Sequence, residues 1–108
     1  MFLAKVAGSL VATQKTEAMR GYKLLLVDPY RVDVKDRRKL VAIGRTFVAV
    51  DTLGAGEGEM VLITQGSSAR LTPETKNLPI DTVIVGIIDS VRVEEHTVFD
   101  REARRVGD

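Results

Sequence analysis

The residues that could carry chemistry are concentrated in one stretch rich in glycine and serine, DTLGAGEGEMVLITQGSSAR, which spans residues 51–70. Such material builds phosphate cradles, and a serine beside glycine is the nucleophile of some hydrolases. The first part of the stretch is a glycine loop, made of Gly54, Ala55, Gly56, Glu57 and Gly58. It lacks the glycine spacing of a dinucleotide-binding fingerprint, and it lacks the lysine and hydroxyl of a P-loop. Because Glu57 and Glu59 would also repel a phosphate, we expect a tight connection that uses glycine where φ is positive.

The second part of the stretch is a serine turn, made of Gly66, Ser67, Ser68, Ala69 and Arg70. Catalysis by one of its serines would require the single histidine, His96, as the base, and the surrounding pattern is not Gly-x-Ser-x-Gly. We expect instead that Ser68 caps one short helical turn, because serine oxygens accept the unpaired N–H groups at such a start. Arg70 would then project toward a carboxylate or toward an anion in a channel. We assign no catalytic residue.

The composition excludes several other kinds of site. With no cysteine, one histidine and scattered acids, the sequence predicts no metal site, and no motif calls for a cofactor. The 16 basic and 15 acidic residues nearly cancel, so no overall field attracts nucleic acid. A local basic cluster, Arg37 to Lys39, is flanked by acids, and the five aromatic residues are dispersed along the chain. A solvated surface is the better interpretation, and single-strand binding remains the alternative because it needs aromatic platforms and a basic groove.

Short apolar runs separated by Gly, Pro and Asp predict an all-β chain. Five strands in so small a chain indicate a closed, OB-like β-barrel, because closure removes exposed sheet edges. We expect one domain over residues 1–108, with the barrel in 1–94 and a C-terminal extension in 95–108. The charged run from Arg31 to Gly44 is expected to be a solvated excursion or a weak hairpin. The predicted strands are Phe2 to Thr13, Tyr22 to Pro29, Arg45 to Thr52, Glu59 to Thr64 and Thr82 to Glu94.

Two of these strands contain successive apolar residues, KLLLV and VIVGII, although alternate side chains must point to opposite faces. Both faces therefore need cover, and a neighbouring copy is the candidate for the outer one. The alternative is that some of these side chains are simply exposed, as isolated apolar residues often are. The candidate interface residues are Leu24, Leu26, Val83, Val85 and Ile87.

The two ends of the chain carry no motif that suggests chemistry. The N-terminal stretch MFLAKVAGSLVATQK has a lysine among its apolar residues and a strand-like rhythm, which is unlike a secretion signal. The longest uncharged apolar run is far shorter than the roughly 20 residues that cross a bilayer, so we expect no membrane segment. The tail that begins at Asp100 is expected to form a short polar helix or to remain loose. The lack of cysteine favours the cytosol.

Four stretches together resemble a known family. MFLAKVAGSLVATQK, GYKLLLVDP, FVAVDTLGAGEGEMVLITQGSSAR and LPIDTVIVGIIDSV are similar, in order and spacing, to the vertex proteins of bacterial microcompartment shells, the relatives of ethanolamine-utilisation and carboxysome vertex proteins. The resemblance covers about Met1 to Glu94, and its most specific parts are AVDTLGAGEGE and GSSAR taken together. Met60 departs from the family pattern, in which an aromatic residue is expected, and the excursion from Arg31 to Gly44 belongs to this chain.

The resemblance implies a small β-barrel that assembles as a cyclic pentamer at the vertices of a polyhedral shell in the bacterial cytoplasm. Hexameric shell proteins would be its partners, and it would carry no catalysis of its own. It also implies that the glycine loop and the serine turn lie near subunit contacts or near the narrow axial opening of the ring. An OB-type module that binds single-stranded nucleic acid is the alternative function. Which metabolic pathway the shell encloses is not encoded in these motifs.

Overall fold

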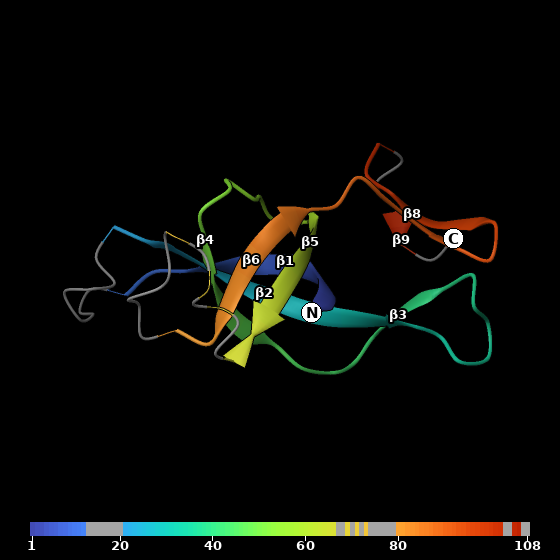
Figure 1. Ribbon diagram of the computed structural model, residues 1–108, viewed down its shortest axis with the longest axis horizontal. Coiled ribbons are helices and arrows are strands. Elements are labelled where there is room, and N and C mark those ends of the chain that lie inside the picture. Colours follow the sequence, from blue (N-terminus) through green and yellow to red (C-terminus); the bar gives the residue numbers. More distant parts are fainter. Residues whose placement is uncertain are drawn as a thin grey trace.

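The protein is described here by a computed structural model, which covers residues 1–12, 21–66, 69, 71, 73, 80–102 and 105–106. Strands account for most of this part of the chain (Figure 1). They are β1 (Phe2–Leu10), β2 (Lys23–Val32), β3 (Leu40–Ala42), β4 (Phe47–Asp51), β5 (Met60–Gln65), β6 (Thr82–Ile87), β7 (Ser90–Val93), β8 (His96–Asp100) and β9 (Arg105–Val106).

Five strands close into a barrel in the order β1-β5-β6-β4-β2, and β2 pairs with β1 to complete the circle. All contacts are antiparallel except that between β4 and β6, which is parallel. This Greek-key arrangement is the one expected for an OB-like barrel, so the predicted fold class is confirmed. The long strand β2 also serves a second purpose, because its last residues pair with β3 and extend the sheet beyond the barrel.

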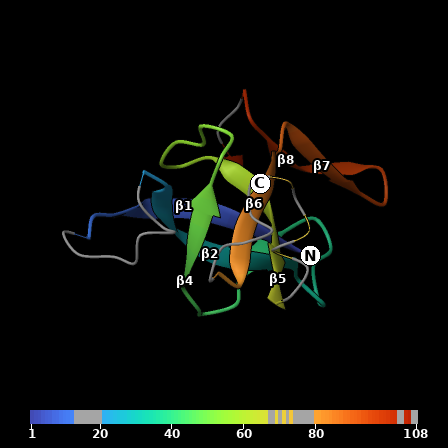
Figure 2. The ribbon, with the colours of Figure 1, turned by 60° about the vertical axis from the view of Figure 1, so that its left-hand side comes forward.

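A second sheet of three strands, β7-β8-β9, stands beside the barrel. Figure 1 shows it at the same end of the molecule as β3, and Figure 2 confirms from another direction that β4 lies on the opposite side. The two sheets are joined by a cluster in which Met60 and Leu40 pack with Val98 and Phe99. The second sheet thereby covers an outer face of the barrel wall.

The barrel interior is filled by small and branched side chains that alternate along the strands. Ala4 and Val6 from β1 meet Leu25 and Val27 from β2, and each is at most 1% exposed. The other members of this cluster are Ala49, Ala55, Val61, Ile63 and Ile84. The alternation on β2 places the intervening residues on the outer face of the wall.

The outer face around β4 and β6 is covered partly by the chain itself. Val50 and Val83, both 1% exposed, pack with Ala69, and Ile80 lies against the same cluster. The expectation that a neighbouring copy alone could shelter this face is therefore too simple for Val83. In this small protein, Ala69 and Ile80, which lie between β5 and β6 in the sequence, supply a second layer over this face.

The predicted strand from Thr82 to Glu94 is wrong as a single element. It is divided into β6 and β7, which belong to different sheets. The break occurs where Ile88 donates its N–H to the carbonyl of Met60 at 2.9 Å and the chain then leaves the barrel. The sequence does not reveal this break, because Ile87 packs against the barrel interior and Ile88 against the cluster beside the second sheet, and both residues are apolar.

Two further expectations can be compared with the fold. Residues 31–44 do form a weak hairpin, in which Val32 pairs with Leu40. Residues 33–39 connect this pair and are called the charged loop. The expected helical or loose tail is wrong for Arg105–Val106, which form β9, and Asp100 closes a turn by accepting the N–H of Glu102 at 3.0 Å. The predicted helical turn starting at Ser68 falls largely outside the described residues. No helix among the described residues has the length and apolar character to span a membrane.

Candidate assembly surface

The glycine loop is anchored at its start by a buried carboxylate. Asp51 ends β4, and its side chain is fully buried. Its two oxygens accept the N–H groups of Leu53 at 2.9 Å and Ala55 at 2.8 Å. Lys23 lies 3.6 Å from the same carboxylate and donates to the carbonyl of Ala55 at 2.8 Å. Asp51 therefore closes the turn that follows β4.

The other end of the loop is fixed by Glu59. Its Oε1 accepts the N–H of Gly56 at 2.8 Å, while its own N–H donates to the carbonyl of Gly56 at 3.2 Å. Gly58 donates its N–H to the carbonyl of Val6 on β1 at 2.8 Å. The N–H groups of Gly56 and Gly58 are thus used within the protein and are not free to cradle a phosphate. Positive φ angles at Gly54 (82°) and Gly58 (86°) explain why glycine is required there.

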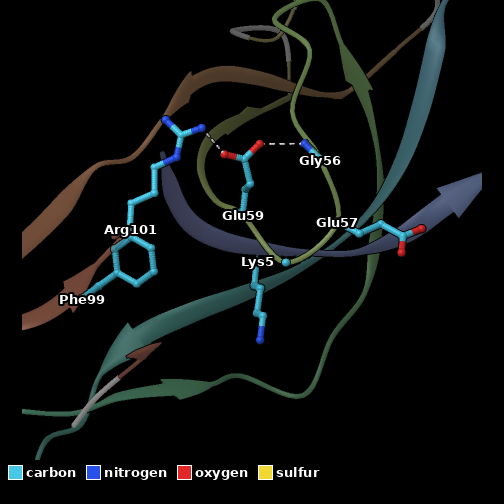
Figure 3. A pocket seen from close by; sticks show the side chains of 7 residues that line it. Lys5, Gly56, Glu57, Glu59, Phe99 and Arg101 are labelled. Carbon is cyan, nitrogen blue, oxygen red and sulfur yellow. Dashed lines mark hydrogen bonds and ion pairs between the residues drawn. The ribbon is translucent and has the colours of Figure 1, made fainter. Parts of the chain in front are cut away.

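A hollow of about 340 Å³ lies between the glycine loop and the second sheet (Figure 3). It is lined by Lys5, residues 56–59, Phe99 and Arg101. Arg101 reaches across it, and one guanidinium nitrogen lies 2.6 Å from Oε2 of Glu59. Sequence reasoning missed this contact, because Arg101 lies in a tail that offered no motif.

The serine turn is described only in part. Gly66 has a φ of 70° and donates its N–H to the carbonyl of Asp81 at 2.8 Å. Ala69 is fully buried in the cluster with Val50 and Val83. Ser67, Ser68 and Arg70 lie outside the described residues, so the turn's expected roles in capping, in charge pairing and at an opening remain predictions.

The five candidate interface residues occupy different environments. Val83 is buried, and Leu24 and Val85 are half-buried against its cluster. Ile87 packs partly buried against the cluster that fills the barrel interior. Leu26 is half-buried on the outer face, opposite Val48 of β4, which is 45% exposed.

An apolar outer stripe therefore runs across three neighbouring strands, β1, β2 and β4. Cross-strand partners share a face, and the pairs are Leu10 with Leu24 and Leu26 with Val48. Leu10 is 40% exposed, so a row of aliphatic side chains meets solvent on one flank of the barrel. The outer stripe is defined here as Leu10, Leu24, Leu26 and Val48. The sequence pattern indicated its β2 members but not Leu10 or Val48.

Other functional classes find little support in the described residues. Within them, no three His, Asp or Glu side chains form a group suited to a metal ion. Four of the five aromatic rings pack into clusters, which leaves them poorly placed to stack on bases. Phe2 differs from these four, at 42% exposed. The basic cluster is partly neutralised, since Arg37 pairs with Glu94 at 2.8 Å and Arg38 with Asp36 at 3.3 Å.

A family model described as ethanolamine utilisation protein EutN/carboxysome matches residues 1–89 of the chain. Among curated proteins, the microcompartment shell vertex protein GrpN of Rhodospirillum rubrum is 44% identical over 84% of the chain and 96% of its own length. The carboxysome shell vertex protein CcmL of Synechocystis is 41% identical over 94% of the chain and 95% of its own length.

The chain is also similar to solved structures of shell proteins. CcmL of Gloeobacter violaceus superposes with a TM-score of 0.81 at 33% identity, covering 94% of this chain and 99% of that one. The pentameric microcompartment shell protein GrpN of Rhodospirillum rubrum has a TM-score of 0.70 at 43% identity, covering 86% and 98%. Both similarities cover most of each chain.

Proposed function

The chain belongs to the EutN/CcmL family, and we propose that five copies of it form a ring that closes one vertex of a polyhedral microcompartment shell. Relatives in this family are named shell vertex proteins of microcompartments and carboxysomes. The chain is accordingly a structural shell protein of the bacterial cytoplasm and not an enzyme. As a vertex protein it associates with other shell proteins, and we infer that hexameric tiles are the ones beside it.

The outer stripe is the observation that carries the proposed ring. The closed part of the barrel has no free sheet edge to pair with a neighbour, and the strand edges of the molecule lie at β3 and in the second sheet. Contacts between two barrel walls are therefore made by side chains. In a ring, each copy presents two different faces, because the contact is head to tail. The outer stripe supplies one apolar face, and its half-exposed side chains gain stability when a neighbour removes them from water.

We place the glycine loop and the serine turn at or near these contacts, or at the axial opening. Small side chains allow another backbone to approach closely, and Leu53 in the loop region is 48% exposed. Ala55 and Ala69 are fully buried within one copy, so they would act by positioning their neighbours. The candidate residues are Gly54, Ala55, Gly56, Gly58, Gly66, Ser67, Ser68, Ala69 and Arg70, together with Leu24, Leu26 and Val85. Val83 and Ile87 pack within one copy, so they would act only by supporting these residues.

Light scattering coupled to size exclusion tests the ring directly. One copy has a mass of 11.8 kDa, so a pentamer would have about five times that mass, near 59 kDa. We expect this mass at micromolar concentration over a range of salt concentrations. A stable monomer or dimer under all these conditions would exclude the proposed assembly.

The variant Val48→Asp tests the outer stripe. Val48 is 45% exposed in one copy, so a carboxylate there should change the free energy of unfolding of the subunit by only about 0.5 kcal/mol. In a ring contact the same carboxylate would be desolvated without a partner, which costs several kcal/mol. We expect the mass to fall toward that of one copy, while circular dichroism still reports folded strands.

Val34→Asp is the matched control, because Val34 is 74% exposed and lies in the charged loop away from the stripe. It should retain the mass of the wild type. If Val48→Asp were as fully assembled as Val34→Asp across a dilution series, the outer stripe would lie outside the subunit contact.

A further inference from the structure

The second sheet begins where the match to the family model ends, at residues 90 and 89 respectively. Its turn after β8 nevertheless contacts Glu59, the residue that follows the glycine loop. The backbone N–H of Arg101 donates to the carbonyl of Asp89 at 2.8 Å, which fixes the base of the side chain at the point where the chain leaves the barrel. One guanidinium nitrogen lies 3.4 Å from the Asp89 carboxylate, and another lies 2.6 Å from Glu59.

Glu59 uses its two oxygens for different partners. Oε2 faces Arg101, and Oε1 accepts the N–H of Gly56 in the middle of the glycine loop at 2.8 Å. Figure 3 shows this chain of contacts from Arg101 through Glu59 to Gly56. A carboxylate held from one side has fewer rotamers available, so its second hydrogen bond is made at a smaller entropic cost.

The alternative partners of Glu59 are few within the described residues. Lys5 lines the same hollow, and neither an ion pair nor a hydrogen bond joins its ammonium group to Glu59. The side chain of Glu59 is 22% exposed and that of Arg101 is 51% exposed, so the carboxylate is the more enclosed member of the pair. Glu59 would therefore lose its charged partner if Arg101 were removed.

We propose that Arg101 is a positioning residue for ring assembly: through Glu59 it holds the glycine loop in the conformation that meets the neighbouring copy. The link to assembly rests on the proposed function, in which the glycine loop lies at a subunit contact. The second sheet then does more than cover the barrel wall. It holds the glycine loop in its contact conformation before two copies meet, which lowers the entropic cost of ordering the loop at the contact.

Hydrogen exchange at the Gly56 amide in the full-length protein tests the first half of this proposal. In Arg101→Ala we expect exchange about two to five times faster than in the wild type, the range that follows from the typical strength of a half-exposed ion pair. Arg101→Lys should recover part of this loss, because an ammonium group can reach one carboxylate but cannot bridge two as a guanidinium does.

Arg37→Ala is the matched control for the first half. Arg37 is 52% exposed and also forms an ion pair with the second sheet, with Glu94 at 2.8 Å, but its partner does not contact the glycine loop. Its removal should leave exchange at Gly56 unchanged. Equal exchange in Arg101→Ala and Arg37→Ala would overturn the proposal.

Glu59→Gln separates charge from hydrogen bonding. The amide oxygen can still accept from Gly56, while the attraction to Arg101 is lost. We expect Arg101→Ala to speed the exchange of Gly56 less in the Glu59→Gln background than in the wild type, because both changes remove the same interaction. Independent, multiplicative effects would show that Arg101 acts on the loop by another route and would contradict the relay.

The assembly half is tested by the protomer concentration at which the ring dissociates, followed by light scattering on dilution. Arg101→Ala should raise this concentration several-fold relative to Arg37→Ala. Faster exchange at Gly56 with an unchanged dissociation concentration would overturn the link to assembly and leave the ring intact. A wild type that never forms a ring would instead remove the proposed function, and the exchange result would still report on the relay.

Discussion

The glycine loop and the charged loop, residues 33–39, use the same local bond in opposite settings. Asp51 accepts the N–H of the residue two positions later at 2.9 Å, and Asp33 and Asp36 do the same at 3.0 and 3.1 Å. The side chain of Asp51 is fully buried, whereas the turns at Asp33 and Asp36 are exposed to solvent. The hydrogen bond alone therefore does not distinguish a fixed loop from a solvated one.

The difference lies in what surrounds each carboxylate. Asp51 has a second backbone donor, Ala55, and a cationic neighbour, Lys23, which also binds the loop's carbonyl. In the charged loop, water can replace any lost partner at little cost, because unsatisfied polar groups are expensive only when buried. The comparison teaches that the glycine loop is held as part of the barrel, although its composition suggests flexibility.

The largest effect is expected from Asp51→Ala. This change leaves the N–H groups of Ala55 and Leu53 without their acceptor and removes the carboxylate beside Lys23. We expect a loss of about 3 kcal/mol in the free energy of unfolding. Asp33→Ala, the matched change in the charged loop, should cost at most about 0.5 kcal/mol. Urea denaturation at one fixed protomer concentration measures both values, since assembly makes stability depend on concentration.

Equal losses of stability in these two variants would contradict the comparison, because burial would then have no influence on how much the hydrogen bond contributes to the free energy of unfolding. A loss confined to Asp51→Ala would support it. Asp51→Asn sharpens the result, since an amide can accept from only one of the two N–H groups without presenting a donor to the other.

A smaller effect separates the glycines within the loop. Gly58 has a φ of 86°, so Gly58→Ala should cost about 1 kcal/mol through backbone strain, although no atom crowds the new methyl group. Gly56 lacks such a φ, and a methyl group there would lie 3.5 Å from a Glu59 oxygen, which is ordinary contact. Gly56→Ala should therefore be close to neutral. Thermal unfolding of the two variants side by side measures the difference, and the reverse order would contradict the assigned conformations.

The smallest effect concerns pH and the charged loop. The backbone N–H of Arg38 donates to Asp36, and this bond, with the nearby Arg38 guanidinium, lowers the pKa of that carboxyl below its ordinary value of 3.8. Because the folded pKa is depressed, the stabilisation is present above pH 3.8 and is lost as the pH falls through the folded pKa. Wild type should thus exceed Asp36→Asn slightly in thermal stability near pH 5, and the gap should close in strong acid. A gap that widened on acidification would have the wrong sign.

Much of the fold could be predicted from the sequence, because its strands are short and bounded by turn residues. The runs around Leu25, Ala49 and Ile63 were placed correctly, and the glycine loop was recognised as a connection. The division between β6 and β7 could not be predicted, because the apolar residues Ile87 and Ile88 follow one another without a break but pack in different clusters. Only tertiary contacts decide where such a strand ends.

The candidate site was less predictable than the fold. Apolar runs indicated that the wall needs outer cover, but they could not indicate that Ala69 and Ile80 of the same chain provide part of it around Val83. The contact between Arg101 and Glu59 joins residues far apart in sequence, and although Glu59 ends the stretch AVDTLGAGEGE, no motif marks Arg101 as its partner. Contacts between residues that are far apart in the sequence could not be predicted from local sequence patterns.

The packing of Ala69 against Val50 and Val83 has a consequence for the supply of vertex subunits to a shell. Because its own chain covers Val83, a single copy of the barrel can fold before it meets a neighbour. Under the proposed function, the number of closed vertices would then follow the abundance of such folded copies of the chain. Raising its expression should yield smaller and more numerous compartments, and lowering it should leave elongated, unsealed ones.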